Sequence, residues 1–218
     1  MQLRRNHYIT DALLASRLLF IHIPKNAGTS VAEKLYGRTL GHRSAQFYKA
    51  ALPGKLFDEC VRFAVLRDPR ERFVSAFTYL KQHAYRPADI AFRDRWLGEV
   101  EDIVVFIELF QSPDFRKAMM NWPHFRDQCQ FICDKQGMLL IDYVFSMRAL
   151  DKANAFVDAV LGESGVIGKT NASSRGAAPD LDWRIVDEVY AEDQRLFDYL
   201  ARSEVGVVRT SSAQRRGC

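Results

Sequence analysis

The stretch LLFIHIPKNAGTSVAEKLY, residues 18–36, joins a short apolar run to a polar turn and an amphipathic continuation. The apolar run at 18–23 predicts a buried strand, which Pro24 ends. Residues 26–28 form the expected turn, and a helix is expected to begin at Val31. The stretch therefore predicts a strand, a tight loop and a helix, and the rest of the chain is interpreted around it.

The predicted loop has the features of an anion site. The first N–H groups of a helix lack intrahelical partners, and the helix dipole adds partial positive charge there. Thr29 and Ser30 supply hydroxyl groups, and either one can cap the helix. Gly28 lets a phosphate approach the backbone, and Lys25 adds a full positive charge. An ATP-binding loop has lysine directly after its last glycine, whereas Lys25 precedes the glycine of this loop by three positions.

A second strand-to-helix unit follows at residues 61–80. The run VRFAVLR at 61–67 predicts a strand, and Asp68 and Pro69 fit the cap and the first position of a helix. Ligands of parallel sheets bind beyond the carboxyl ends of the strands. Since Lys25 and Arg67 each follow a predicted strand, we expect them to lie in one crevice.

The rest of the chain predicts an α/β fold with a mostly parallel sheet flanked by helices in a single domain. We expect a helix capped by Ser44, a strand at 143–146, a helix at 149–161 and one last helix that starts near Asp180 or Asp182. Residues 84–100 show weak periodicity and predict an irregular excursion or short helices. The expected organisation is a lead-in at 1–17, a domain at 18–205 and a flexible tail at 206–218.

Two strings resemble the signatures of the carbohydrate sulfotransferases, in particular the heparan-sulfate 2-O-type enzymes and their bacterial relatives. HIPKNAGTS resembles their 5′-phosphosulfate-binding loop, with Asn26 in place of the commoner threonine. FAVLRDPRERFVSAFTYL resembles their 3′-phosphate-binding signature. Weaker similarities continue to about residue 200, with Asp127 where proline is usual and Arg148 where glutamate is usual. The resemblance implies a P-loop-like sheet and a sulfuryl donor, 3′-phosphoadenosine 5′-phosphosulfate (PAPS), whose product is the 3′,5′-bisphosphate.

The resemblance also implies roles for individual residues. Lys25 corresponds to the lysine that acts in catalysis and contacts the donor, and Arg72 matches a second arginine that we expect to pair with Asp68 or Glu71. The remaining residues implied in donor binding are Asn26, Ala27, Gly28, Thr29, Ser30, Arg67, Ser75, Asn171, Ser173 and Arg175. The terminal string VDEVYAEDQRLFDYL resembles a structural element of the family.

A histidine in the interval after the first loop acts as general base in similar enzymes, and His42 occupies that interval. An imidazole has a pKa near neutrality and suits this task. His22 is its competitor, although its place in the strand favours a role in positioning the loop. The resemblance implies a carbohydrate or glycolipid acceptor, and basic residues at 81, 86, 93 and 95 would suit an anionic one.

Two other functions are compatible with these motifs: a nucleotide-dependent phosphotransferase and a non-catalytic nucleotide-binding protein. We expect no metal, because Cys129, Cys133 and His124 lack a fourth ligand and match no usual zinc spacing. A net charge of +4 without a nucleic-acid module predicts no nucleic-acid partner. No apolar run has the length of a membrane span. The expectation is a bacterial cytoplasmic enzyme, soluble or peripheral to a membrane, of undetermined oligomeric state.

Overall fold

A mixed sheet forms the centre of the protein. The computed structural model describes residues 8–162, 181–202 and 207–209. The strands lie in the order β1-β2-β3-β4, with β1–β2 and β2–β3 parallel and β3–β4 antiparallel. Their bounds are β1 Leu18–Ile21, β2 Val61–Leu66, β3 Tyr143–Ser146 and β4 Val207–Arg209. The predicted α/β class with a mostly parallel sheet is confirmed.

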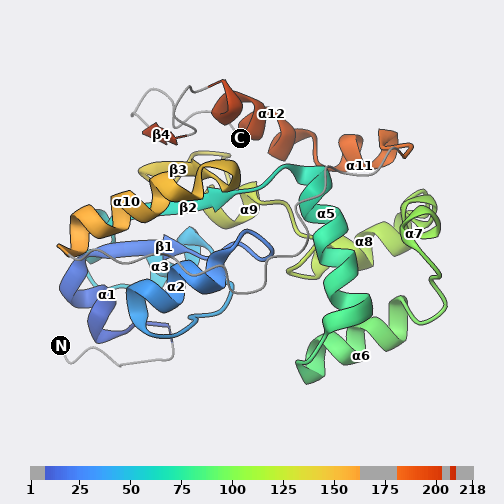
Figure 1. Cartoon of the computed structure of the whole chain (residues 1–218), viewed down its shortest axis with the longest axis horizontal. Helices are drawn as coiled ribbons and strands as arrows, with labels where there is room; N and C mark the ends of the chain where they lie inside the picture. Colours follow the sequence, from blue (N-terminus) through green and yellow to red (C-terminus); the bar gives the residue numbers. More distant parts are fainter. Residues whose placement is uncertain (1–7, 163–180, 203–206, 210–218) are drawn as a thin grey trace.

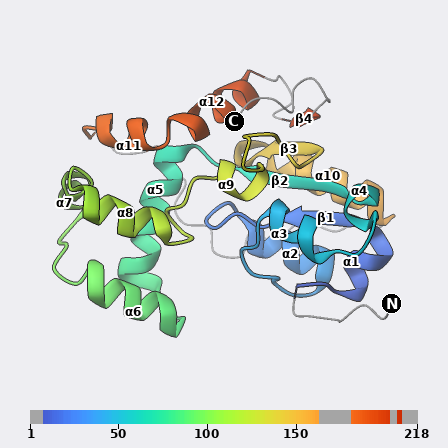
Figure 2. The same ribbon diagram turned by 180° about the vertical axis from the view of Figure 1, so that it is seen from behind.

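Helices cover both faces of this sheet. Helix α10 lies in front of the sheet in Figure 1, whereas α4 and α9 lie on the side that faces the viewer in Figure 2. The sheet and these helices share one hydrophobic cluster, in which all four residues of β1 are buried. The helices of this part are α1 Asp11–Ser16, α2 Gly28–Tyr36, α3 Ala45–Ala51, α4 Leu56–Glu59, α9 Cys129–Ile132 and α10 Leu150–Leu161, with a 3₁₀ turn at Met147–Ala149.

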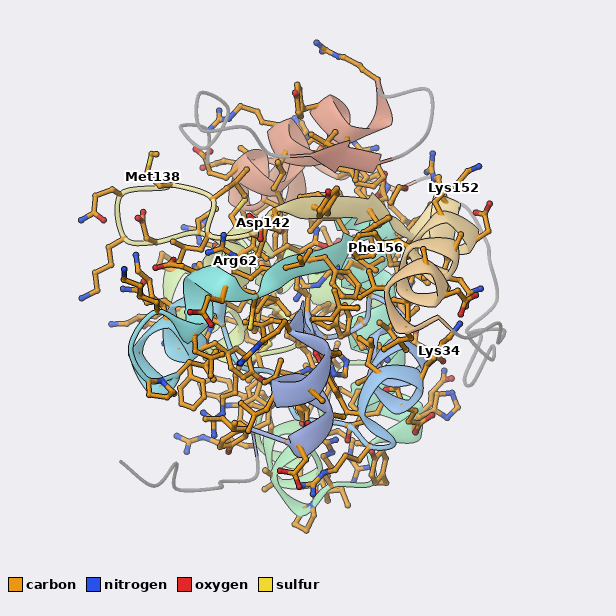
Figure 3. The ribbon with its side chains drawn as sticks, turned by 90° about the vertical axis from the view of Figure 1, so that its left-hand side faces the viewer. Lys34, Arg62, Met138, Asp142, Lys152 and Phe156 are labelled. Carbon is orange, nitrogen blue, oxygen red and sulfur yellow. The ribbon has the colours of Figure 1, made fainter. Side chains whose placement is uncertain are left out.

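Two polar pairs join elements of the sheet part that are distant in the sequence (Figure 3). Arg62 donates through Nε and Nη2 to the carboxylate of Asp142, at 2.8 and 2.7 Å. This bidentate pair joins β2 to the segment that enters β3. On the opposite side Lys34 of α2 forms an ion pair with Asp158 of α10. The two pairs thus join β2 to the entry of β3, and α2 to α10.

A second hydrophobic cluster lies in the helical part of the molecule, on the right of Figure 1. Phe73 of α5 is at its centre and contacts Phe106, Phe110 and Phe125 at ring-centroid distances of 5.1, 5.1 and 5.8 Å. The helices of this part are α5 Pro69–Thr78, a π-helical turn η1 Tyr79–His83, α6 Pro87–Trp96, α7 Ile103–Leu109, α8 Pro113–Asn121 and α11 Arg184–Val189. The next helix, α12 Ala191–Ala201, buries Leu196, Phe197 and Leu200 in the hydrophobic cluster of the sheet part. No helix among the described residues has the length and apolar character needed to cross a membrane.

Several predicted elements need correction. Of the two alternatives for residues 84–100, the irregular excursion is wrong and a helix is found, the ten-residue α6, whose first turn Pro87 fixes after an extended Arg86. The expected last helix is broken at Tyr190, whose buried hydroxyl donates a hydrogen bond to Phe125 O. Residues 207–209, within the expected tail, form strand β4, which pairs with β3, and the rest of that tail lies outside the described residues.

Candidate functional site

The loop that follows β1 has an unusual backbone. The strand ends at Ile21, two residues earlier than predicted. Lys25 and Ala27 both adopt left-handed conformations, with φ of 70° and 56°. The helix then begins at Gly28 instead of Val31, so the two hydroxyl residues lie within its first turn and neither caps it. Left-handed non-glycine residues cost about 1–3 kcal/mol each and persist where the surroundings hold them.

The space beside Gly28 is occupied by an imidazole. A Cβ atom at this position would lie 2.0 Å from Cδ2 of His22. Glycine is therefore required for close packing of His22 against the start of α2, whatever else the loop binds. This contact places His22 against the start of α2, and its role in positioning the loop stays a prediction.

Gln128 holds the other side of the loop and is fully buried. Its Oε1 accepts hydrogen bonds from Asn26 Nδ2 at 2.6 Å and from Arg67 N at 3.1 Å. Its Nε2 donates to Arg67 O at 2.9 Å. The backbone N–H of Gln128 donates in turn to Asp193 Oδ2 at 2.8 Å. One glutamine thus joins the loop after β1 to the end of β2, and α12 anchors that glutamine.

Two arginines hold the backbone of the loop. Arg67 Nη1 donates to Lys25 O at 3.4 Å, and Arg72 Nε donates to Pro24 O at 3.1 Å. The predicted pairing of Arg72 with Asp68 or Glu71 is wrong, since the buried Arg72 reaches inward to the loop. Glu71 lies instead 3.5 Å from Arg67 Nε. Arg67 Nε and Arg72 Nη2 are buried and donate no hydrogen bond within the described structure.

The ammonium group of Lys25 lies over an aromatic ring. Its Nζ is 4.3 Å from the ring centroid of Tyr79, which belongs to the π-helical turn η1. Burial and the nearby charge of Arg67 lower the pKa of Lys25, Asp89 partly offsets them, and the resulting pKa is about 8. Turns of π-helix often occur at functional sites. Lys25 is consequently a cation that can lose its proton a little above neutral pH.

Three histidines from separate segments form a chain of ring contacts. The ring centroids of His22 and His42 are 4.4 Å apart, and those of His42 and His124 are 5.8 Å apart. Burial lowers the pKa of His22 to about 3 and that of His42 well below its usual value, and His124 shifts in the same direction for the same reason. All three imidazoles are therefore neutral at physiological pH.

The hydrogen bonds of two of these rings determine their tautomers. His42 Nδ1 lies 3.2 Å from His22 O, and a carbonyl oxygen can only accept. His42 consequently carries its proton on Nδ1, which leaves Nε2 as a proton acceptor. His124 Nε2 lies 3.3 Å from Asp89 Oδ1. Although burial opposes it, the hydrogen bond from His124 lowers the pKa of Asp89, so that carboxylate is ionised and His124 donates to it.

The structure brings together most of the predicted residues. Lys25 and His42 lie on the loop side of β1, and Arg67 contacts that loop from the end of β2. Ser75 is buried within α5. Ala27 precedes α2, in which Thr29 is partly exposed and Ser30 is buried. The predictions at positions 171, 173 and 175 lie outside the described residues.

The basic residues expected on the acceptor side have mixed roles. Lys81 Nζ donates to Leu97 O at 2.9 Å, and Arg93 bonds its neighbour Asp94. Arg95 lies over the ring of Trp96. Arg86 is exposed, and its charge contributes to the lowered pKa values of His22 and His42. Of these four positions, Arg86 is the one associated with the histidines.

Sequence reasoning missed Gln128, Asp89 and Tyr79 as site residues, and it considered His124 only as a metal ligand. Gln128 had a usable signal, because it stands in one of the weaker resembling strings. Asp89 and His124 are 35 positions apart in the sequence, so their pairing follows from tertiary structure.

Chemically, the site offers an ammonium, buried guanidinium groups and a neutral imidazole with a free acceptor nitrogen. Within the described ranges, no group of three or more histidine, cysteine or acidic side chains is placed to hold a metal ion. A separate groove of about 410 Å³ between α7 and α11 includes none of the predicted site residues. Comparisons with family models, with curated proteins and with solved structures found no match to this chain.

Proposed function

We propose that this chain is a sulfotransferase that moves a sulfuryl group from PAPS to a hydroxyl group of a carbohydrate or glycoconjugate. The observation that carries the proposal is the contact between Arg67 Nη1 and Lys25 O, at 3.4 Å. It joins the two strings that resemble the donor-binding signatures at the carboxyl ends of neighbouring parallel strands. We also infer that the sheet and its first loop are P-loop-like, since ligands of such sheets bind at this edge.

The residues present fit a donor with two anionic ends. Arg67 and Arg72 bring guanidinium groups to the loop, and Arg72 Nη2 is a buried donor without a hydrogen bond within the described residues, from which a phosphate oxygen could accept. Lys25 brings a further positive charge, and the first turn of α2 brings its backbone N–H groups. The site thus supplies positive charge on both sides of the loop. PAPS supplies the activated sulfuryl group.

The residues of the chain then have distinct tasks in an in-line transfer. His42 accepts the proton of the acceptor hydroxyl at Nε2 while the hydroxyl oxygen bonds to sulfur. Lys25 stabilises the negative charge left on the phosphate oxygen when the bond from that oxygen to sulfur breaks. Arg67 holds the donor by its 3′-phosphate, so positioning and charge stabilisation account for most of the catalysis.

Calorimetric titration with 3′,5′-adenosine bisphosphate tests the proposal. We expect the wild type to bind the bisphosphate without metal and Arg67→Ala to bind it about 100-fold more weakly or worse. Two charge-assisted hydrogen bonds, each about 1.5–3 kcal/mol, are lost in this variant. Arg93→Ala is the matched control, because the partly exposed Arg93 side chain pairs with its neighbour Asp94 on α6 and contacts no predicted donor-binding residue among the described ones.

The same titration separates the alternatives. Tight binding of ATP only with magnesium would support a phosphotransferase and contradict the proposal. If Arg67→Ala binds the bisphosphate as tightly as the wild type, Arg67 does not bind the 3′-phosphate and this assignment is wrong. Because Arg67 is buried, Arg67→Lys serves as a second variant that keeps the charge and loses the fork of donors. Thermal unfolding of each variant confirms that it is folded before the titration.

A further inference from the structure

Asp89 is the buried carboxylate at the junction between Lys25 and the histidines. It lies on α6, and its side chain is 7% exposed. One oxygen, Oδ2, accepts a hydrogen bond from the Tyr79 hydroxyl at 2.8 Å. The other, Oδ1, lies 3.3 Å from His124 Nε2. Asp89 therefore binds the aromatic ring beneath the Lys25 ammonium and the imidazole next to His42.

The charges around Lys25 make this carboxylate unusual. The groups whose fields act on the Lys25 ammonium are Arg67 from the end of β2, Arg72 from α5 and Asp89 from α6. Two of them are cations, and Asp89 is the anion. Tyr79 from η1 provides the ring face, and His124 from the segment after α8 is neutral. Burial and neighbouring arginines lower the pKa of an ammonium group, and a nearby negative charge raises it, so Asp89 extends the pH range in which Lys25 keeps its proton.

We propose that Asp89 is a positioning residue of this site: its carboxylate holds Tyr79 under Lys25 and His124 beside His42, and its charge keeps Lys25 an ammonium. The proposal rests on the proposed function in one respect: the charge of Lys25 matters for catalysis only if the chain transfers a sulfuryl group. The charge relation itself can be measured without any donor. A neutral Lys25 could not stabilise the leaving phosphate oxygen.

The first experiment measures the protonation of Lys25 in the unliganded protein. A small amine reagent labels lysines only in the uncharged form, so the rate of Lys25 labelling against pH, read by peptide mass spectrometry, reports its pKa. We expect a midpoint near pH 8 in the wild type, since burial lowers the pKa of Lys25 to about 8. In Asp89→Asn we expect the midpoint to fall by about one pH unit, as for a lost opposite charge nearby. Exposed Lys152 is the internal reference.

Two variants make the result specific. Asp94→Asn removes an exposed carboxylate from the same helix, and we expect no shift of the Lys25 midpoint. Tyr79→Phe keeps the ring beneath Lys25 and the charge of Asp89 but removes the hydroxyl group between them. We expect it to retain the wild-type midpoint. A shift in Tyr79→Phe as large as in Asp89→Asn would show that lost packing is responsible and would overturn the role of the charge.

The second experiment measures bisphosphate affinity at about pH 6.5 and about pH 9. At the lower pH Lys25 is an ammonium in both proteins, so Asp89→Asn should bind as tightly as the wild type or more tightly. At the higher pH the variant should bind about 10-fold more weakly, because a larger fraction of its Lys25 is neutral. A defect in folding would weaken binding at both pH values. It would therefore not give a variant that binds normally at about pH 6.5 and weakly at about pH 9.

The outcomes distinguish the inference from the proposed function. If Asp89→Asn shifts the labelling of Lys25 but the wild type binds no bisphosphate, the sulfotransferase proposal fails and the role of Asp89 stands. If the wild type binds the bisphosphate and the Lys25 midpoint is the same in Asp89→Asn and Asp94→Asn, the inference fails and the proposed function stands.

Discussion

The two sides of the loop at residues 22–28 are built in different ways. On the side of β2, Gln128 makes three side-chain hydrogen bonds to Asn26 and to the backbone of Arg67. On the side of the histidines, the ring of His42 contacts the rings of His22 and His124. There, two ring nitrogens, Nδ1 of His22 and Nδ1 of His124, are buried without a hydrogen bond.

The difference separates fixed geometry from adjustable protonation. Gln128 bonds through an amide that does not titrate, so that side of the loop keeps its shape over a wide pH range. The imidazoles are neutral because burial lowers their pKa values, and this leaves a proton-accepting nitrogen on His42. Under the proposed function, holding the anion and accepting the proton would fall to these two separate networks.

The largest effect is expected when the Gln128 network is broken. Gln128→Leu keeps the volume but removes three hydrogen bonds and leaves Arg67 N and O unpaired in the interior. We expect the free energy of unfolding to fall by about 3 kcal/mol or more. For a chain of this size that corresponds to a decrease in Tm of about 10 °C. Urea and thermal unfolding measure both quantities.

Gln130→Leu is the matched control for this change. Gln130 is exposed, and its amide bonds only to Asp127 at 2.7 Å. We expect its effect to stay within about 0.5 kcal/mol. Similar losses for the two leucine variants would contradict the view that Gln128 organises the loop.

The next effect concerns the histidine side and appears as pH dependence. The pKa of His22 is about 3 in the folded protein because of burial, against an ordinary value of 6.5. Between these values the unfolded chain binds a proton that the folded protein does not. The free energy of unfolding therefore has its full value above pH 6.5, and it decreases as the pH falls towards the folded-state pKa of His22. From His22 alone we expect a loss of about 2 kcal/mol between about pH 7 and about pH 5.

Unfolding by urea at the two pH values measures this dependence. In His22→Gln we expect the difference between the two pH values to shrink by about 2 kcal/mol. His83→Gln, which alters an exposed histidine, should retain the full difference. If both variants behave like the wild type, the low pKa of His22 is wrong and the histidine side is not held neutral by burial.

Local signals in the sequence predicted much of the fold. The bounds of β3 agree with the prediction, and α3 begins after Ser44, whose side chain accepts a hydrogen bond from Phe47 N. Asp68 likewise caps α5 by accepting from Arg70 N and Glu71 N. Such signals lie within a few residues of the element they define, so a single sequence contains them.

Contacts between distant segments explain what could not be predicted. The helix α2 begins early because the left-handed Ala27 precedes it, and Arg67 and Arg72 hold that loop from more than 40 positions away. The carboxylate of Asp89 meets His124 only after α6 and α8 have packed. No local pattern marks these pairings, and the weak periodicity at residues 84–100 concealed α6 itself.

The smallest effect is expected at Arg148, where the resembling family usually has glutamate. Arg148 Nη2 lies 3.0 Å from Glu71 Oε1, and its side chain is 67% exposed. Glu71 therefore lies between the exposed Arg148 and the buried Arg67. Exposed ion pairs contribute about 0–1 kcal/mol, so Arg148→Glu should lower the free energy of unfolding by less than about 1 kcal/mol.

The same variant should weaken bisphosphate binding about 2- to 5-fold, because it places a negative charge near the anion site, and added salt should reduce the difference. Arg148→Gln removes the positive charge without adding a negative one, and it should give about half of that effect. A loss of stability as large as that of Gln128→Leu would contradict this ranking. It would mean that the Gln128 network extends through Arg67 and Glu71 to Arg148 at the surface. Arg148 would then have a structural role in place of the glutamate that the resembling family usually has.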